Sequence, residues 1–339
     1  MTQTLVTDHS GTSGPAGVAE PGGNARPAQK RNLRTPILLQ LAAMIGIGAL
    51  LYPSAADWVA TLGHNAEVSG YVREVEQLPG EVRLEKLQVA KDYNAHMPAG
   101  VLRDPYGANG DAELQEDAAY QAYTQVLRVS DNGVIGEMSY PRLNISLPVY
   151  HGTSEEAISK GVGHLYGSSL PVGGPSTHSV LTSHSGLVNA SLFTKLPKAE
   201  IGDTFQVTVL GETQYYQVDG IETIEPFVTD SLGITQGEDR VTLITCTPIG
   251  VNSHRLLVHG IRVDAPPGAG DRVIDGDGRT AGFPWWALAF LGGSAATAYL
   301  LFVPPKSQRA SRAAASHAGR TRQAATPTEL TQNDQETRA

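Results

Sequence analysis

The sequence predicts a mainly β domain, a closed or nearly closed barrel, held at a membrane by an apolar helix near each end. Three observations predict this fold class. Short strand-like segments separated by Gly and Pro turns follow one another from residue 126 to residue 263. Uncharged apolar runs stand near both ends of the chain. The segments outside these runs are basic, whereas the chain between them is acidic.

Charge and composition limit the possible functions. The chain of 339 residues carries a formal net charge of −9, so we expect no nucleic-acid partner. Zinc sites combine several Cys or His residues at short spacing, and a single cysteine with scattered histidines does not meet this requirement. The sequence contains no phosphate-binding loop and no dinucleotide fingerprint. We therefore expect neither a metal ion nor a cofactor.

The first apolar run, residues 37–52, is marginal in length for a membrane span. It is either an uncleaved anchor or the core of a signal peptide, because the Ala-rich stretch after Pro53 offers a weak cleavage-like site. The long leader before it favours the anchor. We predict a disordered cytoplasmic tail over 1–36 and a transmembrane or signal-anchor helix over 37–54.

The second apolar run, residues 283–303, is uncharged and long enough to cross a bilayer. It begins with Trp285 and Trp286, which suit a membrane interface. A buried core helix is the alternative, which the basic tail directly after the run disfavours. Basic residues follow this run and precede the first one, so the positive-inside rule places both termini in the cytoplasm and the middle of the chain outside. These residues are Arg26, Lys30, Arg31, Arg34, Lys306, Arg309, Arg312, Arg320 and Arg322.

The spacing of apolar residues and the composition divide the chain between and after the two runs into segments. Residues 55–98 have helical spacing, with a break expected at Pro79. Residues 99–125 lead into the β domain, which we place at 126–265. A linker rich in Gly and Asp follows at 266–282, then a transmembrane helix at 283–303 and a basic disordered tail at 304–339. The predicted strands include 178–184, 204–210, 213–224, 240–246 and 254–263.

Between two of the early strands, the stretch HGTSEEAISKG indicates a short helix. Thr153 and Glu156 have the spacing of a capping box, in which the hydroxyl and the carboxylate each accept from the other residue's backbone N–H. We therefore expect this helix to begin after Thr153.

Cys246 is the only cysteine and ends the predicted strand in VTLITCTPIG. Exported proteins normally use cysteines in disulfide pairs, so a single thiol is either an inert buried side chain or a reactive nucleophile. The cysteine alone slightly favours the inert alternative. Its place at a strand end, next to a proline that stops the pairing, would hold the thiol firmly at the rim of a barrel.

A thiol nucleophile needs a cation and a proton carrier nearby. Arg255 opens the next predicted strand, so an antiparallel pairing would bring it beside Cys246; the alternative is an ordinary surface arginine in a solvated ion pair. His184 ends another strand and is only mildly favoured over the other histidines of the β domain. Those are His151, His164, His178, His254 and His259.

Three motifs resemble the sortase family. TLITCTPIGVNSHRLLVHG resembles the sortase cysteine signature with its following arginine strand, and LPVGGPSTHSVLTSHSGL resembles the sortase histidine segment. The stretch LPVYHGTSEEAISKGVGHLYGSSLPVGG is similar to class C sortases, the pilin polymerases of Gram-positive bacteria. Two details depart from the family pattern: a serine in place of glycine before His184, and NSHR in place of the commoner NTHR.

The resemblance implies an eight-stranded barrel and a role for each candidate residue. Cys246 would be the acyl-thioester nucleophile, His184 the proton donor and acceptor, and Arg255 the oxyanion or substrate-positioning group. The substrate would be a sorting signal of the Leu-Pro-x-Thr-Gly type, cleaved after Thr. The acyl group would pass to a lysine amine of a pilin subunit, so the partners would be pilins or other surface proteins that carry this signal.

Class C members also carry a lid, a loop with an Asp-Pro-aromatic motif before the barrel. Here Asp104, Pro105 and Tyr106 match that motif. The resemblance implies that Tyr106 covers Cys246 and that Asp104 pairs with an active-site group such as Arg255. The alternative is an ordinary turn, since Asp, Pro and Gly favour turns.

Other functions remain as alternatives at this point. L,D-transpeptidases also use one Cys and one His, but there the two stand close together in the sequence. Papain-like proteases place the cysteine before the histidine, the reverse of the order here. A housekeeping sortase that attaches proteins to peptidoglycan and a non-catalytic membrane-tethered β domain are the remaining alternatives.

Overall fold

The computed structural model describes residues 32–97, 102, 104–106, 117–129, 132–266 and 281–303. Most of both predicted tails, most of the predicted linker and much of the segment 99–125 lie outside the described residues. The three residues Asp104, Pro105 and Tyr106 lie within them.

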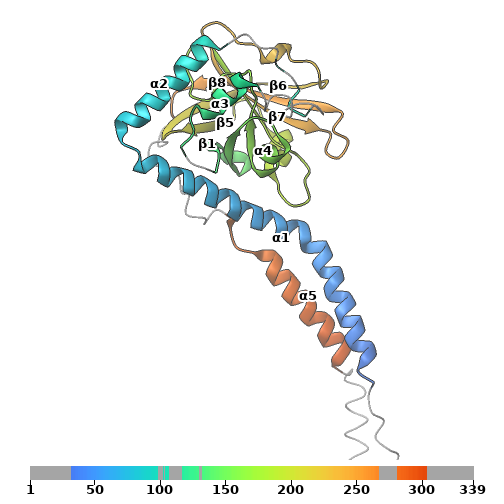
Figure 1. Cartoon of the computed structure of the whole chain (residues 1–339). Coiled ribbons are helices and arrows are strands. Elements are labelled where there is room, and N and C mark those ends of the chain that lie inside the picture. Colours follow the sequence, from blue (N-terminus) through green and yellow to red (C-terminus); the bar gives the residue numbers. More distant parts are fainter. Residues whose placement is uncertain are drawn as a thin grey trace, which may run out of the picture.

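Eight strands close into a barrel in the order β1-β2-β3-β4-β7-β8-β6-β5, which stands at the top of the molecule in Figure 1. The predicted fold class is therefore confirmed. The short strand β3 lies outside the strands that the sequence pattern identified. The bounds are β1 Val134–Tyr140, β2 Ile145–His151, β3 Val162–His164, β4 Thr177–Thr182, β5 Thr204–Val209, β6 Glu212–Ile224, β7 Asp239–Thr247 and β8 His254–Val263.

Strand β7 is central to the arrangement, because it pairs in parallel with β4 and antiparallel with β8. Successive residues of a strand point to opposite faces. Leu243 of β7 belongs to the main hydrophobic core. Ile244 faces the other way and forms a smaller apolar cluster with Val180 of β4 and Leu257 of β8. We call this second side of β4, β7 and β8 the outer face.

Five α-helices and three short 3-10 helices are described. Their bounds are α1 Arg34–Gln77, α2 Gly80–His96, α3 Ala118–Gln125, α4 Glu155–Lys160, α5 Trp285–Phe302, η1 Pro141–Leu143, η2 Leu192–Lys198 and η3 Asp230–Leu232.

Helix α1 joins the apolar run to the barrel without a break, and it continues through Pro53. The buried residues of α1 all lie in its second half, between Asn65 and Val75. There Tyr71 donates a hydrogen bond to the carbonyl oxygen of Ile135 (2.9 Å) and accepts one from the backbone N–H of Leu210 (2.8 Å). Because this hydroxyl bonds to β1 and to the β5–β6 turn, the upper part of α1 is fixed to the barrel.

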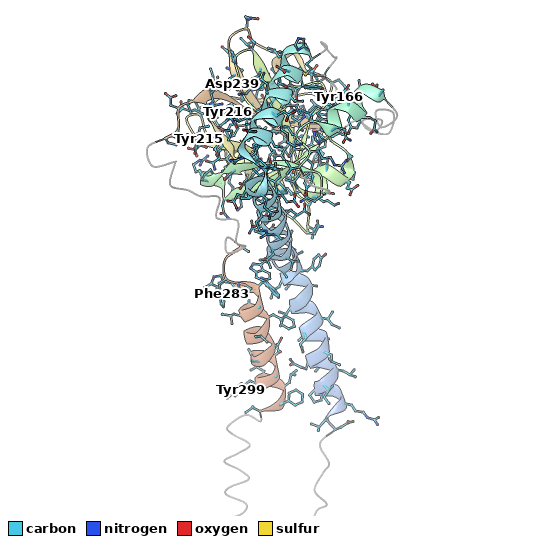
Figure 2. The ribbon with its side chains drawn as sticks, turned by 60° about the vertical axis from the view of Figure 1, so that its left-hand side comes forward. Tyr166, Tyr215, Tyr216, Asp239, Phe283 and Tyr299 are labelled. Atoms are coloured by element: carbon cyan, nitrogen blue, oxygen red, sulfur yellow. The ribbon has the colours of Figure 1, made fainter. Side chains whose placement is uncertain are left out.

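Helices α1 and α5 lie side by side below the barrel, and Figures 1 and 2 show the same arrangement from two directions. Gln40 donates from Nε2 to the carbonyl oxygen of Ser294 (3.0 Å), and Trp58 donates from Nε1 to that of Gly282 (3.0 Å). Both helices are long and apolar enough to span a membrane, and no residue of α5 is buried. A buried core helix at 283–303 is therefore excluded, and the two helices are consistent with membrane anchoring.

The short helix α4 begins one residue later than its sequence indicated. Ser154 is the N-cap, and its side chain accepts from the backbone N–H of Ala157 (3.2 Å). The capping box predicted for Thr153 and Glu156 is therefore wrong. Glu156 instead pairs with Lys160 one turn further on (2.6 Å).

Candidate active site

Cys246 and Arg255 lie directly opposite each other on the antiparallel strands β7 and β8. Directly opposed residues project to the same face of a sheet. Both residues are buried: the exposed fraction is 6% for Cys246 and 7% for Arg255. The alternative of a solvated surface arginine is therefore wrong for Arg255.

His184 follows the end of β4, and its two neighbours bond to β7. Ser183 donates from its backbone N–H to the carbonyl oxygen of Ile244 (3.3 Å). Ser185 donates from Oγ to the carbonyl oxygen of Cys246 (2.7 Å). Because the parallel pairing continues past the end of β4, His184 is held beside the Cys246 end of β7.

The guanidinium of Arg255 is bound by Asp104 from a segment far away in the sequence. Nε donates to Oδ1 (2.8 Å) and Nη2 to Oδ2 (2.7 Å) of Asp104, a bidentate ion pair in which both side chains are buried. Nη1 donates to the backbone carbonyl oxygens of Asn252 (3.1 Å) and His254 (3.2 Å). These bonds orient the fork of the arginine and also occupy most of its donors.

Tyr106 occupies the space between Arg255 and His184. Its ring centroid lies 4.9 Å from Cζ of Arg255 and 5.9 Å from the centroid of the His184 ring. Its hydroxyl donates to the carbonyl oxygen of Ser183 (2.6 Å) and accepts from Oγ1 of Thr182 (2.7 Å). Asp104 and Tyr106 therefore lie over the end of the outer face that carries Cys246, and the buried Pro105 joins them.

The comparisons with known proteins agree on one family. The sortase domain model matches residues 138–263. Sortase A of Streptococcus agalactiae is 28% identical over 129 residues, which cover 37% of this chain and 51% of the relative. The chain therefore spans about half the length of this curated relative.

Solved structures extend the similarity over almost the whole of the neighbouring chains. Sortase C-1 of Actinomyces oris is 45% identical, with a TM-score of 0.52, and the match covers 54% of this chain and 98% of that one. A pilus-related sortase C of group B Streptococcus is 40% identical, with a TM-score of 0.52 and coverage of 57% and 95%. The chain belongs to the class C sortases.

The surroundings of Cys246 change the acidity of its thiol. Burial raises the pKa of the Cys246 thiol; the positive charge of Arg255 opposes this effect and the negative charge of Asp104 adds to it. Burial also raises the pKa of the Tyr106 hydroxyl, so this group stays a neutral hydrogen-bond donor. In this arrangement the protonated thiol of Cys246 is favoured over the thiolate.

Sequence reasoning missed two side chains, those of Glu155 and Thr245, that contact this sortase site. Glu155, in the first turn of α4, lies 3.0 Å from Nε2 of His184. Thr245 donates from Oγ1 to the carbonyl oxygen of Ser183 (2.8 Å), the same oxygen that Tyr106 contacts. An acidic residue early in a short helix is common, so the sequence held no signal that Glu155 meets a histidine.

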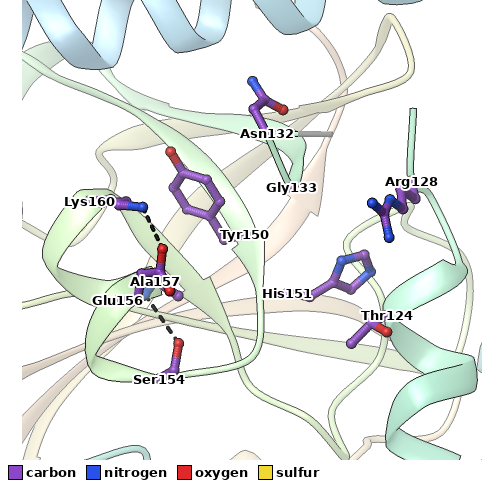
Figure 3. Close-up of a pocket in the computed structure, with 10 residues that line it drawn as sticks. All are labelled: Thr124, Arg128, Asn132, Gly133, Tyr150, His151, Ser154, Glu156, Ala157 and Lys160. Carbon is purple, nitrogen blue, oxygen red and sulfur yellow. Dashed lines mark hydrogen bonds and ion pairs between the residues drawn. The ribbon is translucent and has the colours of Figure 1, made fainter. Parts of the chain in front are cut away.

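The other histidines of the barrel have different environments. His254 is exposed at the start of β8, where its Nδ1 lies 2.8 Å from Oγ of Ser253. His151 lines a pocket of about 290 Å³ beside α4, shown in Figure 3, and none of the predicted site residues lines that pocket. Burial lowers the pKa of His151 to about 3 and that of His164 to about 4, so both stay neutral near pH 7. Among the residues that the structure describes, no group of three His, Cys, Asp or Glu side chains is placed to hold a metal ion.

Proposed function

We propose that this chain is a membrane-anchored cysteine transpeptidase. It cleaves a Leu-Pro-x-Thr-Gly type sorting signal after Thr, keeps the acyl group as a thioester on Cys246, and transfers it to a lysine amine of a pilin subunit. The observation that carries the proposal is the direct cross-strand pairing of Cys246 with Arg255, next to His184 at the end of β4.

The first half of the reaction forms the thioester. The Cys246 thiolate attacks the Thr carbonyl carbon, and the carbonyl oxygen becomes an oxyanion that the N–H groups of Arg255 can stabilise. The C–N bond to Gly then breaks, and the imidazolium of His184 gives its proton to the leaving amine. The products are a neutral His184, the thioester and the released amine.

The second half reverses the roles of these groups. A neutral lysine amine attacks the thioester carbonyl carbon, and His184 accepts the proton that the nitrogen loses. The C–S bond breaks, Cys246 leaves as the thiolate, and an isopeptide bond remains. The thiolate and imidazolium needed for the next cycle are thereby restored, so no cofactor enters the balance.

In this proposal Asp104, Pro105 and Tyr106 form a lid that must open before substrate binds. Asp104 accepts from two N–H groups on one edge of the Arg255 guanidinium, and Tyr106 fills the space between Arg255 and His184. A sorting signal needs the same space and the same donors. The closed lid is therefore the resting state, and its opening precedes acylation.

Two features favour pilin assembly over attachment to peptidoglycan. The first is the lid, and the second is the second apolar helix α5, which together with α1 provides two candidate membrane spans. The similarity to a pilus-related sortase C supports the same assignment. In this proposal both termini lie in the cytoplasm and the barrel lies outside.

Mass spectrometry of the full-length protein after incubation with a Leu-Pro-x-Thr-Gly peptide tests the chemistry. We expect an acyl adduct on Cys246 that disappears when a lysine-containing pilin is added. The adduct should form faster in the double variant Asp104→Ala, Tyr106→Ala and should be absent from Cys246→Ala. No adduct in either lidded or unlidded protein would refute the proposal, and consumption of a peptidoglycan-like amine in place of the pilin would favour the housekeeping alternative.

A further inference from the structure

A continuous chain of hydrogen bonds crosses the outer face at the end away from Cys246. Its three central side chains, His178 of β4, Thr242 of β7 and His259 of β8, are all buried. Nδ1 of His178 lies 2.9 Å from the carbonyl oxygen of Gly233, and its Nε2 lies 2.7 Å from Oγ1 of Thr242. The same hydroxyl lies 2.8 Å from Nδ1 of His259, whose Nε2 lies 3.1 Å from Oε1 of Glu222.

Counting hydrogens shows that this chain needs one proton more than its neutral groups supply. Both ends are pure acceptors, a backbone carbonyl at Gly233 and a carboxylate at Glu222. Four hydrogen bonds need four hydrogens. A neutral imidazole at each histidine and the hydroxyl of Thr242 provide three. The fourth hydrogen makes one imidazole an imidazolium.

The surrounding charges place that proton at the Glu222 end. Burial lowers the pKa of His178, and the nearby Arg240 also disfavours a charge there. Hydrogen bonds from Ser231 and His259 keep the pKa of Glu222 below its usual range, so this side chain is a carboxylate. The fourth hydrogen is therefore best accommodated at His259, whose Nε2 lies 3.1 Å from Oε1 of the Glu222 carboxylate.

The other charged groups of this region are already paired with one another. Arg240 of β7 binds Asp219 of β6 (2.5 Å) and Glu238 of the loop before β7 (2.5 Å). Gly220 of β6 leaves room for the His259 ring, because a methyl group there would lie 3.3 Å from Cδ2 of His259. The backbone of β6 is irregular at this point, where the register shifts between Val218 and Gly220.

The chain ends on a loop that shares an apolar cluster with the strand that carries Cys246. We call residues 225–238 the β6–β7 loop; it contains η3. Leu232, the residue before Gly233, is buried in the apolar cluster of the outer face. Ile244, two residues before Cys246, belongs to the same cluster, and Tyr106 of the lid packs against it. The bond from His178 to Gly233 therefore fixes the loop where it meets the floor beneath the lid.

We propose that His178, Thr242, His259 and Glu222 form a one-proton latch that positions the β6–β7 loop as a wall of the peptide-binding groove. This inference rests on the proposed function and deepens it. These are positioning residues, since they act through the loop and not on the reacting atoms. The latch is complete when the extra proton is bound. As pH rises and the proton is lost, one of the four hydrogen bonds can no longer form, and the loop loosens.

Glu222→Gln gives the sharpest test, because an amide can supply the missing hydrogen. In this variant the amide N–H donates to Nε2 of His259, and all four bonds form with neutral groups. Thr242→Val removes the central hydroxyl at nearly constant volume, and Thr242→Ser restores it. We expect Glu222→Gln to make the latch independent of pH, Thr242→Val to open it at every pH, and Thr242→Ser to resemble the wild type.

Hydrogen exchange of the β6–β7 loop in the full-length protein, held in lipid nanodiscs at pH 6 and pH 8.5, measures the latch directly. Each variant is compared with the wild type at the same pH, so that the intrinsic exchange rate cancels. Glu222→Gln should match the wild type at pH 6 and exchange several-fold more slowly at pH 8.5. Thr242→Val should exchange on the order of three- to tenfold faster at both, the equivalent of one hydrogen bond. Equal exchange of Glu222→Gln and wild type at both pH values would overturn the latch.

The KM for the sorting-signal peptide tests the consequence for function. In the wild type KM should rise between pH 6 and pH 8.5, and this rise should vanish in Glu222→Gln. Thr242→Val should raise KM more than it lowers kcat. If the variants differ in hydrogen exchange of the loop but not in KM for the peptide, the loop does not position substrate and that part of the inference is wrong. Failure of both the wild type and the double variant Asp104→Ala, Tyr106→Ala to cleave the peptide would instead refute the proposed function, while the exchange result still decides the latch.

Discussion

The polar side chains at the two ends of the outer face lie on or next to the same three strands, β4, β7 and β8, but find their partners in different places. At one end, near Cys246, Arg255 pairs with Asp104 and the Tyr106 ring lies against Arg255 and His184; Asp104 and Tyr106 both come from outside the sheet. At the other end, Thr242 and the two histidines bond to each other, and the chain ends on Glu222 of β6 and the carbonyl oxygen of Gly233. The apolar cluster around Ile244 lies between the two ends.

The two ends differ in where their hydrogen-bond partners come from, and this difference suits a different role at each end. The polar groups at the Thr242 end bond only to strands of the barrel and to its β6–β7 loop, so no segment outside the barrel is needed to complete them. Asp104 and Tyr106 belong to no strand of the barrel, so the groups that they contact can be released without unfolding it. A site that must exchange its partners during a reaction therefore needs the second arrangement. The predictions below test this contrast at the lidded end.

The largest effect is expected at Arg255. Arg255→Lys keeps the charge but loses the planar fork that holds Asp104 and would hold an oxyanion. Peptide cleavage should fall on the order of 10²-fold, as for the loss of an oxyanion donor. The matched control is Arg262→Lys on the same strand, where the arginine pairs with Asp239 and lies outside the site. Cleavage by Arg255→Lys within threefold of the wild type would contradict an oxyanion role.

Asp104→Asn should release the lid and change the acidity of the thiol. Loss of the charge-assisted pair should speed alkylation of Cys246 by iodoacetamide on the order of tenfold. Because the Asp104 charge raises the pKa of Cys246, its removal should also move the midpoint of alkylation to lower pH.

The wild-type midpoint provides a separate check of the same environment. Since burial raises the pKa of Cys246, the midpoint should lie above the value of about 8.5 that is usual for a free cysteine. A wild-type midpoint below about 6 would contradict this environment. Asp239→Asn is the matched control for the carboxylate, and it should leave the alkylation profile unchanged.

Tyr106→Phe should have a smaller effect on the lid. The hydroxyl bonds to Ser183 and Thr182, but both partners keep other contacts, from Thr245 to Ser183 and from Thr182 to the carbonyl oxygen of Ile244 (3.2 Å). The net loss is about 1 kcal/mol, which corresponds to roughly fivefold faster alkylation of Cys246. Equal alkylation rates of the denatured proteins serve as the control. An increase as large as that of Asp104→Asn would show that the hydroxyl, not the ion pair, holds the lid.

The smallest effect is expected at Glu155, although it contacts His184. Its side chain is 78% exposed, so water screens the interaction. Glu155→Gln should change kcat/KM by less than about threefold. Glu156→Gln, which breaks only the surface pair with Lys160, is the control. A tenfold loss in Glu155→Gln alone would mean that Glu155 orients the imidazole during catalysis.

Local patterns predicted much of the fold, and their errors have physical causes. The apolar period and the turns located β5 to β8, because alternation and Gly-containing turns are properties of neighbouring residues. The cap of α4 was misplaced by one residue, because Thr153 and Ser154 are both good caps and the choice depends on how β2 leads into the helix. The prediction also separated a membrane helix at 37–54 from the helical segment that follows, whereas α1 runs from Arg34 to Gln77 without a break.

The sequence by itself determined which residues are able to do chemistry, since a lone thiol at a strand end and an arginine at the next strand start are visible in the order of residues. The tertiary structure decided which of these side chains contact one another. The parallel pairing of β4 with β7, the closure of Asp104 onto Arg255 and the four-bond chain through Thr242 join segments far apart in sequence. Such contacts depend on strand register and burial, and no local pattern encodes either.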